Sequence, residues 1–117
     1  MATYSRIILS GSTSGKAVTL VATATPGTTI HTAVAGAAAW DEIYLWISNN
    51  TATAASLTLE FGGTGVANNV PFQLSIPGNC PPIPILTGQV LNGGVVLAGF
   101  GSAASALLAT GYCNRIQ

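Results

Sequence analysis

The sequence predicts an all-β protein: an antiparallel β-sandwich, jelly-roll-like, with eight or nine short strands. Apolar and β-branched residues recur in short runs, several of which alternate with polar residues, which is the period of a strand with one buried face. Residues that favour turns, mainly Gly, Pro and Asn, separate these runs. Because 117 residues suffice for one core, we expect residues 1–117 to form a single β-sandwich domain.

The expected strands follow one another at short intervals. They span residues 3–9, 17–24, 28–34, 43–48, 56–61, 70–76, 83–86, 95–100 and 105–114. Turn-forming segments stand between them at residues 11–15, 26–27, 49–51, 62–65, 68–69, 77–79 and 92–94. Each segment is short enough to join neighbouring antiparallel strands, and many short strands with such turns are typical of a sandwich.

Two local patterns predict how the strands pair. Residues 43–48 and 56–61 carry apolar side chains at their odd-numbered positions, so we expect them to be paired core strands. Asn92-Gly93 tolerates the positive φ of a tight turn, which predicts a hairpin there. Alanine-rich residues 33–39 and 103–109 favour helix by propensity alone. Interruption by Gly, Ser and Thr limits our expectation to a short turn in the first segment.

Charge is the most unusual property of the sequence. Charged residues make up 5% of the chain, the net charge is zero, and residues 61–114 contain none, whereas soluble domains carry about 25%. A free domain normally keeps a charged surface, because otherwise colliding copies associate. We therefore expect the surface to consist of uncharged polar groups or to be covered by protein partners.

The same composition argues against other partners. Three basic residues are too few to bind nucleic acid through its phosphates. The most apolar stretch, residues 95–112, is interrupted by Gly, Ser and Thr, so no membrane-spanning helix is expected. The first residues lack the apolar core of a signal peptide, so we expect synthesis and use without Sec export.

Motifs for catalysis are incomplete. The run from Gly11 to Lys16 has one residue too few between its glycines for a phosphate-binding loop, and Ala17 replaces the metal-binding hydroxyl. We interpret this run as a turn. Asp41 and Glu42 are adjacent, so on a strand they point to opposite faces and cannot flank one substrate bond.

The remaining reactive side chains are isolated in the sequence. His31, the single histidine, has no metal-binding or nucleophile motif around it, and we expect it to face solvent. Glu60 is likewise expected to be solvated at the surface. Cys80 and Cys113 are expected to be reduced thiols, since disulfides are rare outside secreted proteins. The sequence therefore predicts no catalytic residue, no cofactor-binding residue, no metal ligand, no small-molecule substrate and no enzyme activity.

An aromatic stripe is the strongest candidate binding feature. Trp40, Tyr44 and Trp46 fall on the face of one strand opposite its aliphatic residues. Aromatic residues without neighbouring charge are typical of interface centres. Two alternatives stay open: the stripe covers a second layer or contacts another subunit, or it binds a foreign partner.

Several runs resemble small virion structural proteins of tailed bacteriophages. These are the run from Trp40 to Thr51 (WDEIYLWISNNT), its continuation over residues 57–63, residues 85–94 leading into 95–100, and residues 111–116. The likeness lies in the order of strands and turns, and no residue-level binding motif comes with it. It implies a capsid decoration, or cement, protein that contacts the major capsid protein at threefold and quasi-threefold junctions.

The function expected is therefore a structural one on the exterior of the capsid, after synthesis in the host cytoplasm. Self-contact through the aromatic stripe and the symmetry of those junctions predict a homotrimer. An extended N-terminal arm is expected to gain order on the shell; its residues are Met1, Ala2, Thr3, Tyr4 and Ser5. Two alternatives are a head-to-tail connector or tail protein and a carbohydrate-binding module that stacks sugars on Trp and Tyr.

Overall fold

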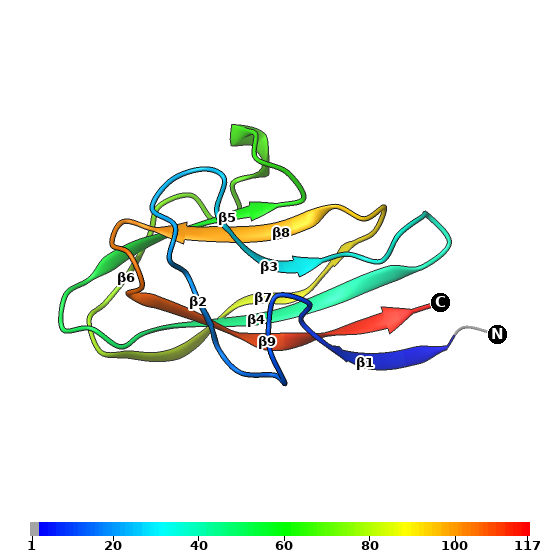
Figure 1. The fold of residues 1–117 in the computed structure, drawn as a ribbon, viewed down its shortest axis with the longest axis horizontal. Coiled ribbons are helices and arrows are strands. Elements are labelled where there is room, and N and C mark those ends of the chain that lie inside the picture. The colour runs from blue at the N-terminus through cyan, green and yellow to red at the C-terminus, as the bar shows by residue number, and fades with distance from the viewer. Residues whose placement is uncertain (1–2) are drawn as a thin grey trace.

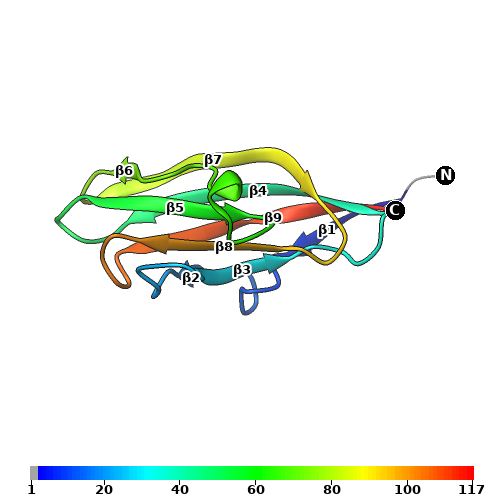
Figure 2. The same cartoon turned by 90° about the horizontal axis from the view of Figure 1, so that it is seen from above.

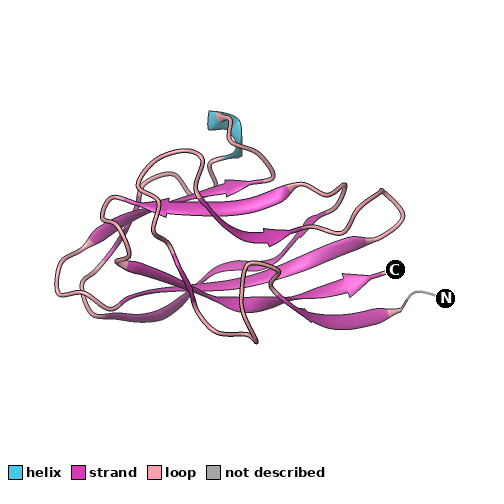
Figure 3. Cartoon of the chain, viewed as in Figure 1, coloured by secondary structure: helices cyan, strands magenta, loops and turns pink. Residues whose placement is uncertain are grey.

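The computed structural model describes residues 3–117, and these residues confirm the predicted fold class. Nine strands form two antiparallel sheets packed as a sandwich, with one 3-10 turn, η1 (Val66–Asn68), outside them (Figure 1, Figure 3). No helix in this described part is long and apolar enough to cross a membrane. The strands are β1 (Tyr4–Ile8), β2 (Val18–Thr19), β3 (Thr28–Thr32), β4 (Trp40–Asn49), β5 (Ala55–Phe61), β6 (Leu74–Ile76), β7 (Cys80–Leu91), β8 (Val96–Gly101) and β9 (Leu107–Ile116).

The strands pair as one long hairpin wound into two layers. β5 pairs with β6, and around this hairpin β4 pairs with β7, β3 with β8 and β1 with β9, all antiparallel. Sheet A has the order β1-β9-β4-β7, with β2 pairing β9 beside β1, and sheet B has the order β3-β8-β5-β6. This nested order is that of a jelly roll. The strands run along the long axis of a molecule measuring 48 × 27 × 21 Å (Figure 2).

The facing sides of the two sheets form the core. Burial alternates residue by residue along β4, where Ile43, Leu45 and Ile47 are fully buried. Leu57 and Leu59 of β5 fill the opposite layer. Full burial of one such side chain contributes about 1.5–3 kcal/mol, so the interior needs no disulfide, and both cysteines are free thiols.

Both predicted pairings are wrong. Residues 43–48 and 56–61 lie in β4 and β5, which belong to opposite sheets. The Asn92-Gly93 turn joins β7 in sheet A to β8 in sheet B and is therefore not a hairpin. Gly93 and Gly94 do have positive φ, 70° and 71°. Their N–H groups donate to the carbonyls of Gly36 and Val34 in the β3–β4 loop, so two connections between the sheets brace each other.

Several strand boundaries also differ from the expectation. β7 extends well beyond residues 83–86, although Pro81, Pro82 and Pro84 lie in it. It is an edge strand, where a proline removes no necessary ladder bond. The expected strands at 17–24 and 70–76 are reduced to β2 and β6. Residues 33–39 form a loop, and the second alanine-rich segment leads directly into β9.

The expected N-terminal arm is corrected in part. Tyr4 and Ser5 belong to β1, opposite Ile116 and Arg115 of β9. Thr3 exchanges backbone hydrogen bonds with Gln117. This part of the arm is thus a strand of the protein's own sheet, because β9 offers it a free edge, while Met1 and Ala2 lie outside the described residues.

Gly111 tests the register of sheet A. It faces Leu45 of β4 with φ +153°, and an added Cβ would lie 2.0 Å from the Tyr44 carbonyl oxygen. We expect Gly111→Ala to lower the free energy of unfolding by about 3 kcal/mol or more, because backbone must move. Gly65→Ala is the matched control, since its Cβ would meet only an ordinary contact at 3.7 Å. Equal urea midpoints for the two variants would contradict this register.

Candidate interaction surface

The predicted aromatic stripe lies on the outer side of sheet A. Trp40, Tyr44 and Trp46 occupy the even-numbered positions of β4, which face away from the core. Trp40 is 40% exposed, and the other two rings are half-buried. A side chain of the neighbouring strand β9 covers part of the Tyr44 and Trp46 rings.

Tyr112 of β9 joins the stripe to β1. Its ring stacks on Tyr44 with centroids 5.1 Å apart and lies 6.2 Å from Trp46. The guanidinium carbon of Arg6 lies 4.7 Å from the centroid of the Tyr112 ring. Sequence reasoning missed Tyr112 and Arg6, because only the pairing of β1, β9 and β4 brings them beside the stripe. The signal available in the sequence was the alternation of small apolar residues with Thr, Tyr and Asn within residues 109–114, which puts Tyr112 on the polar, outward side of that strand.

Register extends this surface along the sheet. Tyr4, Ile116 and Trp40 form one row of Cα partners, and Ile8 is the partner of Tyr112. Tyr4 is 71% exposed and Ile8 53%. We name this surface the aromatic face, which consists of Tyr4, Arg6, Ile8, Trp40, Tyr44, Trp46 and Tyr112.

A hollow adjoins the aromatic face at the edge of sheet A. It has a volume of about 310 Å³ and is lined by Trp40, Val90, Leu91 and Asn92. The aromatic face and this hollow together offer rigid rings beside a recess for an apolar side chain. Such an exposed apolar patch is typical of a protein interaction site.

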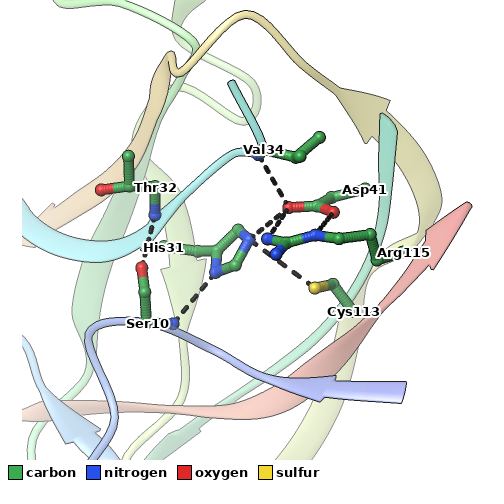
Figure 4. A network of polar contacts seen from close by, with 7 residues as sticks. All are labelled: Ser10, His31, Thr32, Val34, Asp41, Cys113 and Arg115. Atoms are coloured by element: carbon green, nitrogen blue, oxygen red, sulfur yellow. Dashed lines mark hydrogen bonds and ion pairs between the residues drawn. The ribbon is translucent and has the colours of Figure 1, made fainter. Parts of the chain in front are cut away.

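A polar network closes the core at the end of the sandwich near the C-terminus (Figure 4). Asp41, fully buried, accepts hydrogen bonds from Arg115 through Nε at 2.8 Å and Nη2 at 3.0 Å. It also accepts from the Val34 N–H at 3.1 Å and lies 2.8 Å from His31 Nε2. Burial alone would raise the pKa of Asp41, but the bonds from Arg115 and His31 outweigh it and hold that pKa below its ordinary 3.8.

His31 is fixed in one tautomer. The Ser10 N–H donates to His31 Nδ1 at 3.0 Å, so the neutral ring carries its proton on Nε2, directed at Asp41. The expectation that His31 faces solvent is wrong, since it is 1% exposed. A register shift between Thr29 and His31 is the cause, because it turns Ile30 and His31 inward together.

The network contains Cys, His and Asp side chains, yet it is not arranged for nucleophilic catalysis. Cys113 Sγ lies 3.6 Å from the same His31 nitrogen that contacts Asp41, whereas a catalytic triad uses the two ring nitrogens separately. Burial above all, and then the charge of Asp41, raise the pKa of Cys113 to about 11. The thiol therefore stays protonated and is a poor nucleophile.

Within residues 3–117, the same three residues form a group whose ligand atoms could hold a metal ion. Their ligand atoms lie within 4.8 Å of one another. Asp41, however, already accepts bonds from Arg115 and Val34, and His31 Nε2 carries a proton, whereas a metal needs its free lone pair. Hydrogen bonding explains the cluster without a metal.

Glu60 is also corrected. It is 1% exposed and does not face solvent. Thr25 Oγ1 and the Gly27 N–H donate to its two carboxylate oxygens, so Glu60 ties the β2–β3 connection to the outer side of sheet B. The predicted separation of Asp41 and Glu42 is correct, with Asp41 buried and Glu42 on the outer side.

Comparisons with protein-family models, curated proteins and solved structures find no match to this chain. One fold supports many functions, so function is argued from these surfaces.

The pH dependence of folding stability in an Asp41→Asn variant tests the role of Asp41 in the polar network. A lowered folded-state pKa gives stability that is present above the unfolded value, near 3.8, and lost as pH falls through the folded value. We expect Asp41→Asn to cost about 2–4 kcal/mol at pH 7 and to lose less stability than the wild type between pH 5 and pH 2. Urea unfolding at several pH values measures both effects. Glu42→Gln is the surface control, and identical pH profiles for Asp41→Asn and the wild type would contradict the assignment.

Proposed function

We propose that this protein is a non-enzymatic capsid decoration, or cement, protein of a tailed bacteriophage. It binds the outer capsid surface as a homotrimer at threefold and quasi-threefold junctions and stabilises the DNA-filled head. The aromatic face, on a chain almost without surface charge, carries the proposal. Its partners are the major capsid protein and other copies of itself.

The distribution of charge supports a surface built for contact. Asp41 and Arg115 pair in the buried network, and Glu60 is buried under the β2–β3 connection. Only Arg6, Lys16 and Glu42 remain at the surface, and Arg6 and Glu42 both lie on the outer side of sheet A, in one row of Cα partners with Asn114. Three charged side chains give little electrostatic repulsion between copies, so apolar and hydrogen-bonding contacts decide association.

The construction of the aromatic face supports tight attachment. Tyr44, Tyr112 and Trp46 are held against one another before any partner binds, so little side-chain entropy is lost on binding. All three side chains stand on β4 and β9, adjacent strands within sheet A. In a trimer whose subunits turn this face toward the capsid and not toward one another, the face is presented three times, and multivalent attachment strengthens modest single contacts.

The same geometry weighs against stacking sugars on this face. Tyr44 and Tyr112 cover each other, and Arg6 lies over Tyr112. One face of the Tyr44 ring and both faces of the Tyr112 ring are therefore taken by neighbours, while Trp40 and Tyr4 stay exposed. A connector or tail protein would share the aromatic face but differ in copy number, which mass spectrometry of purified virions measures against the major capsid protein.

Removal of the protein from the virion tests the cement role. We expect undecorated capsids to assemble but to release DNA at a lower temperature, because a ligand specific for the intact lattice stabilises it. Adding back purified protein should restore the release temperature at both low and high salt, since few ion pairs are available for screening. DNA release is followed by dye fluorescence during heating. Equal release temperatures with and without the protein would exclude the cement role, and loss of decoration at moderate salt would show that charge drives binding.

Alanine substitutions in the aromatic face test whether this face contacts the capsid. Trp40→Ala and Trp46→Ala are each expected to weaken capsid binding by about 2 kcal/mol, or about 30-fold. Phe72→Ala is the matched control, since Phe72 is 60% exposed but precedes β6 of sheet B. Quantitative decoration assays and sedimentation measure affinity and trimer formation. Tryptophan variants that fold, form trimers and decorate like the wild type would remove this face from the interface.

A further inference from the structure

A second recess lies on the opposite side of the sandwich, on the outer side of sheet B. We name it the sheet B hollow; its volume is about 310 Å³. Ser56 and Thr58 project from β5, and Phe100 is the β8 partner of Thr58. Thr23 and Gln73 line it from the β2–β3 connection and the segment before β6. Ser102, after β8, completes the lining used below.

Backbone bonds fix the hydroxyl groups of this hollow. Thr58 Oγ1 accepts from the Gln73 N–H at 3.1 Å, and Ser102 Oγ accepts from the Ser56 N–H at 2.8 Å. Each hydroxyl keeps its own proton to donate, and the Ser102 hydroxyl is the exposed one of the two, since Thr58 is 2% exposed. Across the described residues, the side chains of Thr23, Ser56 and Gln73 make no hydrogen bond within the protein. The hollow therefore offers both donors and acceptors to a ligand.

Gln73 has an unusual backbone conformation. Its φ is +51°, in the left-handed region that residues other than glycine rarely adopt and that often marks binding sites. The bond from its N–H to Thr58 holds this conformation. Gln73 is thereby kept in the lining of the hollow. On the Thr23 side, the Gly101 N–H donates to the Ala22 carbonyl at 3.3 Å and holds that segment beside β8.

The lining selects a class of ligand. No charged side chain lines the hollow, so a charged ligand would lose hydration without gaining a counter-charge. A purely apolar ligand would leave the hydroxyls unpaired. The ligand must therefore be uncharged and must carry hydrogen-bonding groups. A sugar ring meets both requirements, because its hydroxyls pair with Ser, Thr and Gln and its C–H face packs on an aromatic ring such as Phe100. We propose that the sheet B hollow binds one neutral hexose unit of a saccharide.

This site is independent of the aromatic face, because the two lie on the outer sides of opposite sheets. If sheet A faces the shell, which rests on the proposed function, the sheet B hollow faces outward and is open to glycans around the virion. Sugar binding is measured on the isolated protein and decoration on particles. The failure of one proposal is thus distinguishable from the failure of the other.

Titration of the isolated protein with glucose, galactose, mannose and N-acetylglucosamine tests the site. NMR amide shifts report binding, with glycerol as the control polyol. We expect at least one hexose to give saturable shifts at Gln73, Gly101 and Ser102, with a Kd in the millimolar range typical of a shallow single-sugar site. Glycerol should give none. Absence of saturable shifts up to tens of millimolar for all four sugars, or equal shifts with glycerol, would overturn the proposal.

Two variants test the residues of the hollow. Thr23→Ala removes an exposed hydroxyl, and Gln73→Gly removes the carboxamide while suiting the positive φ. Each is expected to weaken hexose binding about 3- to 10-fold, the value of one hydrogen bond, without lowering the urea midpoint. Thr19→Ala on β2, which is exposed and belongs to sheet A, is the matched control. Unchanged affinity in both variants, or shifts that map to Trp40 and Trp46, would exclude this location.

Discussion

The two-residue period of β4 determines which side chains the protein buries and which it presents. Its odd-numbered residues carry the core aliphatics and Asp41, and its even-numbered residues carry the aromatic stripe. β4 pairs with β9 in one uninterrupted register from Trp40 to Asn49, so β9 shares its alternation, whereas its pairing with β7 on the other side contains three register shifts. A slip of one residue would exchange the two faces. Gly111 opposes such a slip, because backbone of β4 lies where any side chain would be.

Three of the six charged side chains of this protein, Asp41, Glu60 and Arg115, hold the interior and the connections together. Asp41 joins β4 to Arg115 of β9 and, through His31, to sheet B. Glu60 performs a similar task on the outer side of sheet B, where it holds the β2–β3 connection. A buried carboxylate is tolerated only with such partners. Because these charges are used internally, the surface is left almost neutral, and the composition has a structural cause.

The two outer sides of the sandwich have different chemistry. Sheet A presents stacked rings and an apolar hollow, which suit another protein surface. Sheet B presents hydroxyls, a carboxamide and one ring, which suit a small neutral ligand. A sandwich keeps two such surfaces apart, because the core lies between them. One small domain can thus attach to an assembly on one side and remain open on the other.

Local sequence patterns were enough to predict the fold class, the approximate strand positions and the shared face of Trp40, Tyr44 and Trp46, because period-two patterning and turn residues are local properties. Tertiary structure decided which strands pair: similar short turns join strands within one sheet or across two, and the nested pairing comes from contacts between distant segments. It also decided the buried network, since an inward turn at a register shift places His31 beside Asp41. Tyr112 reached the aromatic face for the same reason, because β9 lies between β1 and β4 only in the folded sheet.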